Sequence, residues 1–182
     1  MSFGLTIHAS AVLAGAHAIL IRGPSGAGKS RLVLEFIQAP AAHCGGALLF
    51  TRLVADDRVD VAAVHGRLLA RPAPALAGLL EVRGIGIIRL PHEPVAVVSL
   101  VVDLDGGERM PDTAASRTCI EGIWLPRVAA APGNPFPAVL AALISGRFSV
   151  GGRAPSEIPL GAAYAAAQQS SEERLRSALG SS

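Results

Sequence analysis

Short apolar stretches, broken by glycine, proline and polar residues, recur along most of the chain and predict a strand-rich protein. The first stretches are separated by Ser10 and by a turn at Gly15-Ala16, and they predict a small antiparallel meander. The longest β-branched run ends in Asp103 and Asp105. The β-like stretches cover residues 5–9, 11–13, 17–21, 48–55, 59–64, 66–70, 79–88 and 95–104, and order resumes over 122–128.

Helical spacing of apolar residues appears in three places and adds helices to these strands. Residues 31–37 have this spacing, and residues 137–144 predict a helix with proline in its first turn. A last helix is expected from about 158 to 179, which is rich in Ala, Glu and Arg. Residues 39–46 break the pattern, and the polar segment 106–118 is predicted to be mobile. The chain is therefore expected to have an α/β fold.

The glycine-rich segment before the first helix is a complete G-x-x-x-x-G-K-[ST] motif. Glycines let the backbone curl so that successive N–H groups point at one anion, and the following helix adds its positive N-terminal end. Lysine in this motif reaches the β- and γ-phosphates, and the serine hydroxyl ligates Mg²⁺. The residues expected to bind the phosphates are Gly23, Pro24, Ser25, Gly26, Ala27, Gly28, Lys29 and Ser30.

Composition narrows the class of protein further. A chain of 182 residues fits one domain, 1–182, and 51% hydrophobic residues permit a large core. A net charge of +2 and only 4% aromatic residues argue against nucleic acid or an anionic membrane as a partner. The apolar stretch 5–21 has no preceding Lys or Arg, and no segment is long enough to span a bilayer. We expect a cytoplasmic location.

The cysteines and most of the histidines show no pattern of a functional site. Cys44 and Cys119 lack metal-binding spacing, so each is predicted to be a small buried apolar residue. The histidines expected to be structural are His17, His43, His65 and His92.

Carboxylates at strand ends are the candidates for metal and proton chemistry. Asp56 and Asp57 follow an apolar strand and repel each other, so a compensating cation such as Mg²⁺ is expected. Asp103 also ends an apolar strand, which is the Walker B pattern of ordinary phosphate-loop enzymes. From the residues alone, Asp103 is the first choice for the second magnesium ligand.

Three blocks in the same order resemble the catalytic domain of HPr kinase/phosphorylase. They are the phosphate loop, residues 52–59 (RLVADDRV) and residues 80–88 (LEVRGIGII), of which the last is close to the family signature. His8 is a fourth match, because it lies 21 residues before Lys29 as the family pattern expects. The resemblance covers about residues 5–145 and lacks the family's usual N-terminal domain, so the chain looks like the short, single-domain form.

The resemblance implies a role for each matching residue. Asp57 would accept the proton of an attacking seryl hydroxyl, and His8 would lie against Asp57 and tune its proton affinity. Glu81 would ligate Mg²⁺ together with Ser30, in preference to Asp103, while Asp56 would bind the metal or a water. The remaining implied residues are Arg109 on the transferring phosphoryl group, with Arg117 as its rival, and Arg83, Gly84 and Gly86 shaping the signature loop.

Two departures from the family pattern bear on these expectations. Asp57 lies 28 residues after Lys29, which is longer than in the family, and residues 39–46 look like an insertion. Residues 131–136 stand where the family has a Pro-Gly-Arg-Asn-like loop linked to dephosphorylation, and the arginine is missing. The missing arginine weakens the case for phosphorylase activity more than the case for kinase activity.

The function implied is that of a serine protein kinase using ATP and Mg²⁺ to phosphorylate HPr or a related phosphocarrier. The resemblance also implies a PEP-carboxykinase-like fold with a mixed, largely antiparallel sheet and flanking helices, and a homohexamer. Two alternatives remain open: a small-molecule or nucleotide kinase, and a non-catalytic nucleotide-binding sensor. An intact set of Lys29, Ser30, Asp57 and Glu81 argues against the sensor.

Overall fold

The computed structural model describes residues 3–39, 50–106, 116–131 and 133–144. The chain divides into two compact units, 1–149 and 150–182, and every described residue belongs to the first. The helix expected over 158–179 and the segment 40–46 therefore lie outside the described residues, as do Cys44, His43 and Arg109. Whether the chain is one domain stays a prediction.

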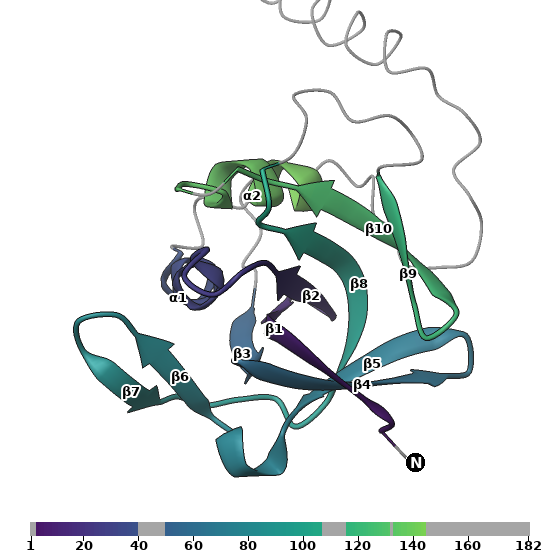
Figure 1. Ribbon diagram of the computed structural model, residues 1–182, viewed down its shortest axis with the longest axis horizontal. Coiled ribbons are helices and arrows are strands. Elements are labelled where there is room, and N and C mark those ends of the chain that lie inside the picture. The colour runs from purple at the N-terminus through teal and green to yellow at the C-terminus, as the bar shows by residue number, and fades with distance from the viewer. Residues whose placement is uncertain (1–2, 40–49, 107–115, 132, 145–182) are drawn as a thin grey trace, which may run out of the picture. The chain divides into compact units, whose positions relative to one another are not determined.

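Strands dominate the described residues; one helix and one short 3-10 turn lie between strands along the chain, and a second helix follows the last strand (Figure 1). The strands are β1 (Leu5–Ala14), β2 (His17–Arg22), β3 (Thr51–Ala55), β4 (Arg58–Val64), β5 (Arg67–Pro72), β6 (Leu79–Val82), β7 (Gly86–Arg89), β8 (Ala96–Asp103), β9 (Arg117–Ile120) and β10 (Ile123–Ala129). The helices are α1 (Lys29–Gln38) and α2 (Phe136–Ile144), and the 3-10 turn is η2 (Pro74–Leu76).

The main sheet closes on itself. Its order is β2-β1-β4-β5-β8-β10-β9, with β3 beside β1, and an additional parallel pairing of β2 with β8 completes a ring of strands. Only the β2–β8 and β8–β10 pairings are parallel among the strands of this sheet, so the expectation of a mixed, largely antiparallel sheet is confirmed. Strands β6 and β7 form a separate hairpin.

Alternation along β2 divides the core into two clusters. Ala18 and Leu20 point into the ring, where small residues such as Ala9, Ala11 and Ala70 let opposite strands approach closely. Ile19 and Ile21 point to the other side, onto α1 and α2 through Phe36 and its edge-on neighbour Phe136. Because both faces of β2 are buried, its sequence reads as a continuous apolar run and not as an alternating one.

Most of the expected elements are present, and three details differ. Ser10 does not separate two strands: β1 runs through it, because its buried hydroxyl finds a hydrogen-bond acceptor in Asp56. The stretch 79–88 is a hairpin that turns at Arg83-Gly84-Ile85, and β9 begins within the segment predicted to be mobile. The prediction for Cys119 is wrong. Cys119 is exposed, because it lies opposite the exposed Trp124 on the outer face of the β9–β10 hairpin.

Candidate active site

The glycine-rich loop connects the end of β2 to the start of α1, as the motif predicts. Gly28 is the N-cap residue of α1 and has φ 97°, a left-handed conformation that favours glycine. Gly23 packs against β8: a Cβ placed on it would lie 3.1 Å from Leu104 Cβ, and Leu104 N–H donates to the Arg22 carbonyl at 2.8 Å. The loop is therefore held at its first residue by the strand beside it.

Lys29 is the first residue of α1, and its side chain folds back over the loop. Its Nζ donates to the carbonyls of Gly23 and Pro24, each at 3.0 Å, and lies 3.0 Å from His8 Nε2. Burial lowers the pKa of Lys29 below its usual 10.5, while the nearby carboxylates of Asp56 and Asp57 act in the opposite direction. The ammonium is thus fixed at the loop in a partly desolvated position, where its charge acts strongly on an anion.

His8 joins Lys29 to Asp57. His8 Nδ1 lies 3.2 Å from Asp57 Oδ1 and 3.1 Å from the Asp57 carbonyl oxygen. Because an ammonium has no acceptor, His8 Nε2 accepts from Lys29, and the ring proton stands on Nδ1, facing Asp57. The contact between His8 and Asp57 that the sequence predicts is therefore present, and it is part of a chain of three side chains.

Asp56 and Asp57 are neighbours in sequence but point to different environments. Asp57 has φ 64° and is exposed, whereas Asp56 is only 5% exposed. Asp56 Oδ1 accepts from the hydroxyls of Ser10 at 2.5 Å and Ser30 at 2.9 Å, and Oδ2 accepts from the Glu81 backbone N–H at 3.3 Å. All three donors are uncharged, so these hydrogen bonds bring no positive charge to the carboxylate.

The donors around Ser30 fit a magnesium ion. Ser30 donates its single proton to Asp56, so its oxygen lone pairs remain available for a cation. No group of three or more His, Cys, Asp or Glu side chains suited to a metal occurs among the described residues. Mg²⁺ takes one or two protein oxygens and otherwise binds water and phosphate, so the Ser30 oxygen is a suitable ligand for it.

Glu81 contacts Asp56 through its backbone N–H, and the Glu81 side chain is exposed. Its proposed role as a metal ligand therefore requires the side chain to turn toward Ser30, and stays a prediction. Arg83 lies close to the loop, because its Nη2 is 3.8 Å from the position of a Cβ on Gly26. Arg117 instead lies over the Trp124 ring, 5.8 Å from its centre.

Asp103, the alternative metal ligand, is bound to two arginines. Arg22 donates Nε and Nη2 to its two carboxylate oxygens at 2.7 and 2.8 Å, and Arg127 Nε also donates to Oδ2. Burial raises the pKa of Asp103, but the hydrogen bonds from Arg22 and Arg127 more than offset it and hold this pKa below 3.8. No local sequence pattern signals this network, because Arg22 and Asp103 are 81 residues apart and meet through the β2–β8 pairing.

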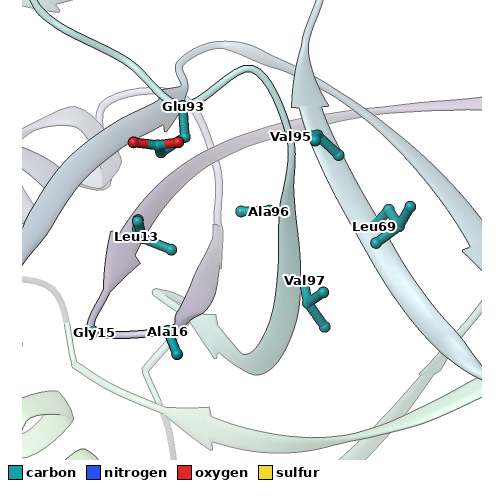
Figure 2. A pocket seen from close by; sticks show the side chains of 8 residues that line it. All are labelled: Leu13, Gly15, Ala16, Leu69, Glu93, Val95, Ala96 and Val97. Carbon is teal, nitrogen blue, oxygen red and sulfur yellow. The ribbon is translucent and has the colours of Figure 1, made fainter.

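A cavity of about 330 Å³ lies at the opposite end of β2 from the loop (Figure 2). It is lined mainly by apolar side chains, among them Leu13, Leu69 and Val97, with Glu93 at its margin. Glu93 is paired with Arg52 at 3.2 Å, so the cavity has no set of converging polar groups comparable to that around Lys29. The candidate site is therefore the loop and the carboxylates next to it.

Together, the fold and this site define a mixed α/β protein in which a glycine-rich loop, a buried carboxylate and a Lys–His–Asp chain meet at one end of a closed sheet. Residues 4–93 match the family model described as the HPr Serine kinase C-terminal domain. This match, the curated relatives and a solved structure confirm the resemblance to the HPr kinase family that was drawn from the three sequence blocks.

Several relatives named HPr kinase/phosphorylase share this similarity. The protein from Clostridium tetani is 45% identical over 73 residues, which is 40% of this chain and 21% of the relative. That from Streptococcus thermophilus is 40% identical over 103 residues, 56% of this chain and 26% of the relative. That from Limosilactobacillus reuteri is 36% identical over 124 residues, 60% of this chain and 35% of the relative. The chain thus spans about a fifth to a third of these curated relatives.

A solved structure covers more of the chain. The Hpr(Ser) kinase/phosphatase from Coxiella burnetii aligns with a TM-score of 0.61 and 25% identity, over 79% of this chain and 97% of that one. Among the described residues, neither helix has the length and apolar character required to cross a membrane.

Proposed function

We propose that this protein transfers the γ-phosphoryl group of ATP, with Mg²⁺, to a seryl hydroxyl of HPr or a related phosphocarrier protein. The observation that carries the proposal is the chain Lys29–His8–Asp57, which brings a phosphate-binding ammonium and an exposed carboxylate to one imidazole. Similarity to the HPr kinase family suggests the substrate class, since the relatives are named for HPr. The proposal includes the PEP-carboxykinase-like fold, a homohexamer and a cytoplasmic location, all of which come from the resemblance.

Asp57 is the residue proposed to take the seryl proton. It is exposed, as a group that receives a protein substrate must be, and His8 Nδ1 fixes one of its oxygens. The left-handed backbone at Asp57 turns its side chain away from the buried Asp56 environment. A positioned general base contributes about 10²–10⁴-fold to such a transfer.

Lys29, Ser30 and Asp56 are proposed to bind the nucleotide and its metal. Bound Mg²⁺ would neutralise charge on the phosphate oxygens. Lys29 supplies a fixed positive charge at the loop, and Ser30 is oriented by Asp56 so that its lone pairs face away from that carboxylate. Arg83 Nη2 lies 3.8 Å from the position of a Cβ on Gly26, and we add Arg83 to Arg109 as a candidate for contact with the transferring group.

Reverse, phosphate-driven dephosphorylation is proposed to be slow. Residues 131–136 lack the arginine of the family's dephosphorylation loop. The test supplies seryl-phosphorylated carrier, inorganic phosphate and Mg²⁺, and measures pyrophosphate. Rapid release of pyrophosphate would show that the missing arginine is not required.

The direct test of the kinase function is incubation of the protein with purified HPr-type carrier, Mg²⁺ and γ-labelled ATP, followed by mapping of the phosphorylated residue. We expect label on a serine of the carrier, and none with the Lys29→Ala variant, which loses the charge at the loop. Transfer to a small molecule or nucleotide would favour the first alternative function. Tight ATP binding with no transfer to any acceptor would favour the nucleotide sensor.

A further inference from the structure

The β6–β7 hairpin has one buried face and one exposed face. Leu80 and Ile88 are cross-strand partners that belong to the core cluster beneath α1. On the outer face, Ile87 is 70% exposed, and Ile85 in the turn is 76% exposed. These are the two most exposed of the large apolar side chains in the described residues. Two such side chains a residue apart on one hairpin form a local apolar surface, which in proteins commonly marks an interaction site.

This apolar surface continues directly into the candidate active site. Ile87 is the cross-strand partner of Glu81, so the two side chains share the outer face. The Glu81 backbone N–H donates to Asp56, and Arg83 in the same turn lies beside the loop at Gly26. Figure 1 shows the hairpin as an arm that extends from the side of the ring near α1. Whatever covers Ile85 and Ile87 is therefore placed next to the reacting groups.

Charge on the same face restricts the kind of partner. Arg89 shares the outer face with Ile87, Arg83 borders it in the turn, and both are exposed. The surface therefore suits a protein that presents apolar side chains bordered by carboxylates. A second copy of this chain seated here would cover Arg83 and Glu81 and block access to the site, so we favour the substrate as occupant.

We propose that Ile85 and Ile87, bordered by Arg83 and Arg89, form the docking surface for the protein substrate, and that the two isoleucines set its KM without taking part in phosphoryl transfer. This inference rests on the proposed kinase function. It identifies the acceptor as a folded protein with an apolar patch next to its serine. The surface contributes binding energy remote from the chemistry, so its loss reduces association with the carrier and leaves ATP binding unchanged.

The test compares the double variant Ile85→Ser/Ile87→Ser with the wild type. We expect the KM for the carrier to rise at least ~10-fold, because burial of two such side chains is lost, while the KM for ATP and kcat at saturating carrier stay within about 2-fold. The matched control is Trp124→Ser, which removes an apolar side chain that is 61% exposed on the β9–β10 hairpin. We expect this control to leave the carrier KM unchanged.

Each other outcome has a definite meaning. An unchanged carrier KM in the double variant overturns the docking surface but leaves the kinase function intact. Absence of carrier phosphorylation by the wild type overturns both. A change in oligomeric mass of the double variant, measured by sedimentation, assigns the surface to a second copy and overturns the proposal. If the double variant fails to fold, Ile87→Thr keeps the β-branched shape, and we expect a smaller rise of about 3-fold in the carrier KM.

Discussion

Two buried carboxylates, Asp56 and Asp103, lie at the ends of strands of the same sheet, and their hydrogen-bond donors differ in charge. Asp103 accepts from two guanidinium groups, while Asp56 accepts from two hydroxyls and a backbone amide. Their exposures, 7% and 5%, are nearly the same. Burial therefore does not distinguish the two sites, but the charge of the donors does. Asp103 is paired with cationic donors within the fold, whereas the donors to Asp56 bring no positive charge to it.

The comparison explains why the pattern of an apolar strand ending in aspartate is ambiguous here. Strand β3 ends immediately before Asp56, and strand β8 ends at Asp103. Only Asp56 contacts Ser30, the residue that the motif assigns to the metal. Asp103 instead ties β2 to β8 and β10 through Arg22 and Arg127, just before the glycine-rich loop begins.

The largest effect on activity is expected at Asp57, the exposed neighbour of Asp56. Asp57→Asn should reduce kinase kcat by about 10²–10⁴-fold, because an amide cannot take the seryl proton. ATP binding, measured by calorimetry, should be retained. Unimpaired turnover in Asp57→Asn would remove Asp57 from the mechanism and leave Asp56 as the next candidate.

A second prediction separates the two buried carboxylates by their metal dependence. Asp56→Asn should raise the Mg²⁺ concentration needed for half-maximal activity by about 10–100-fold, because the orientation of Ser30 is lost. Glu81→Gln should also raise it strongly if Glu81 is a ligand, and Asp103→Asn should raise it only weakly. The measurement is a Mg²⁺ titration at fixed ATP. If Asp103→Asn raised the Mg²⁺ requirement more than Asp56→Asn, Asp103 and not Asp56 would be the carboxylate that acts at the metal.

The third prediction concerns the stability of the fold, for which Asp103 is expected to matter more than Asp56. Asp103→Ala removes the shared partner of two partly buried guanidinium groups, and should lower the free energy of unfolding by about 3–5 kcal/mol. Urea denaturation of the wild type and the variant measures the difference. The variant folded at low temperature should retain a normal Mg²⁺ requirement, which a loss of a metal ligand would not allow.

The smallest expected effect is a pH dependence of the stability that Asp103 contributes to the folded protein. The pKa of Asp103 in the folded protein lies below 3.8, so its ion pairs stabilise the fold fully above the unfolded pKa and less as pH falls through the folded one. The gap in unfolding free energy between wild type and Asp103→Asn should therefore be constant near neutral pH. It should narrow as the pH falls below about 4. A gap that stays constant down to pH 2 would contradict the ion-pair explanation.

Local patterns predicted the parts of the molecule that depend on local physics. The β2–loop–α1 unit, the apolar strand β8 and helix α2 appear close to where periodicity and glycine placement put them. The ring could not be predicted, because the pairings of β1 with β4 and of β2 with β8 join segments about 50 and 80 residues apart, and apolar alternation does not encode a partner. Ser10 was misread as a break because its buried acceptor, Asp56, lies 46 residues away.

Some residues of the candidate site could likewise be predicted from the sequence, and others could not. Lys29 and Ser30 follow from the motif alone, and the proximity of His8 to Asp57 follows from the family resemblance. The Arg22–Asp103–Arg127 network had no sequence signal, since ion pairs between distant strands depend on the closed topology. Cys119 shows the converse error: a residue type that is usually buried lies on an exposed hairpin face.

The closed ring also has a consequence for how motion is distributed in this protein. β2 is hydrogen-bonded on both sides, to β1 over residues 17–22 and to β8 over 18–22. Amide protons in such a strand exchange with solvent only when the ring opens as a whole, so β2 belongs to the slowest-exchanging part of the unit. The β6–β7 hairpin, bonded only within itself among the described strands, can open at a much lower free energy. The nucleotide would thus bind to a loop that follows β2, one of the strands that open least readily. The protein substrate would bind to the β6–β7 hairpin, which opens more readily.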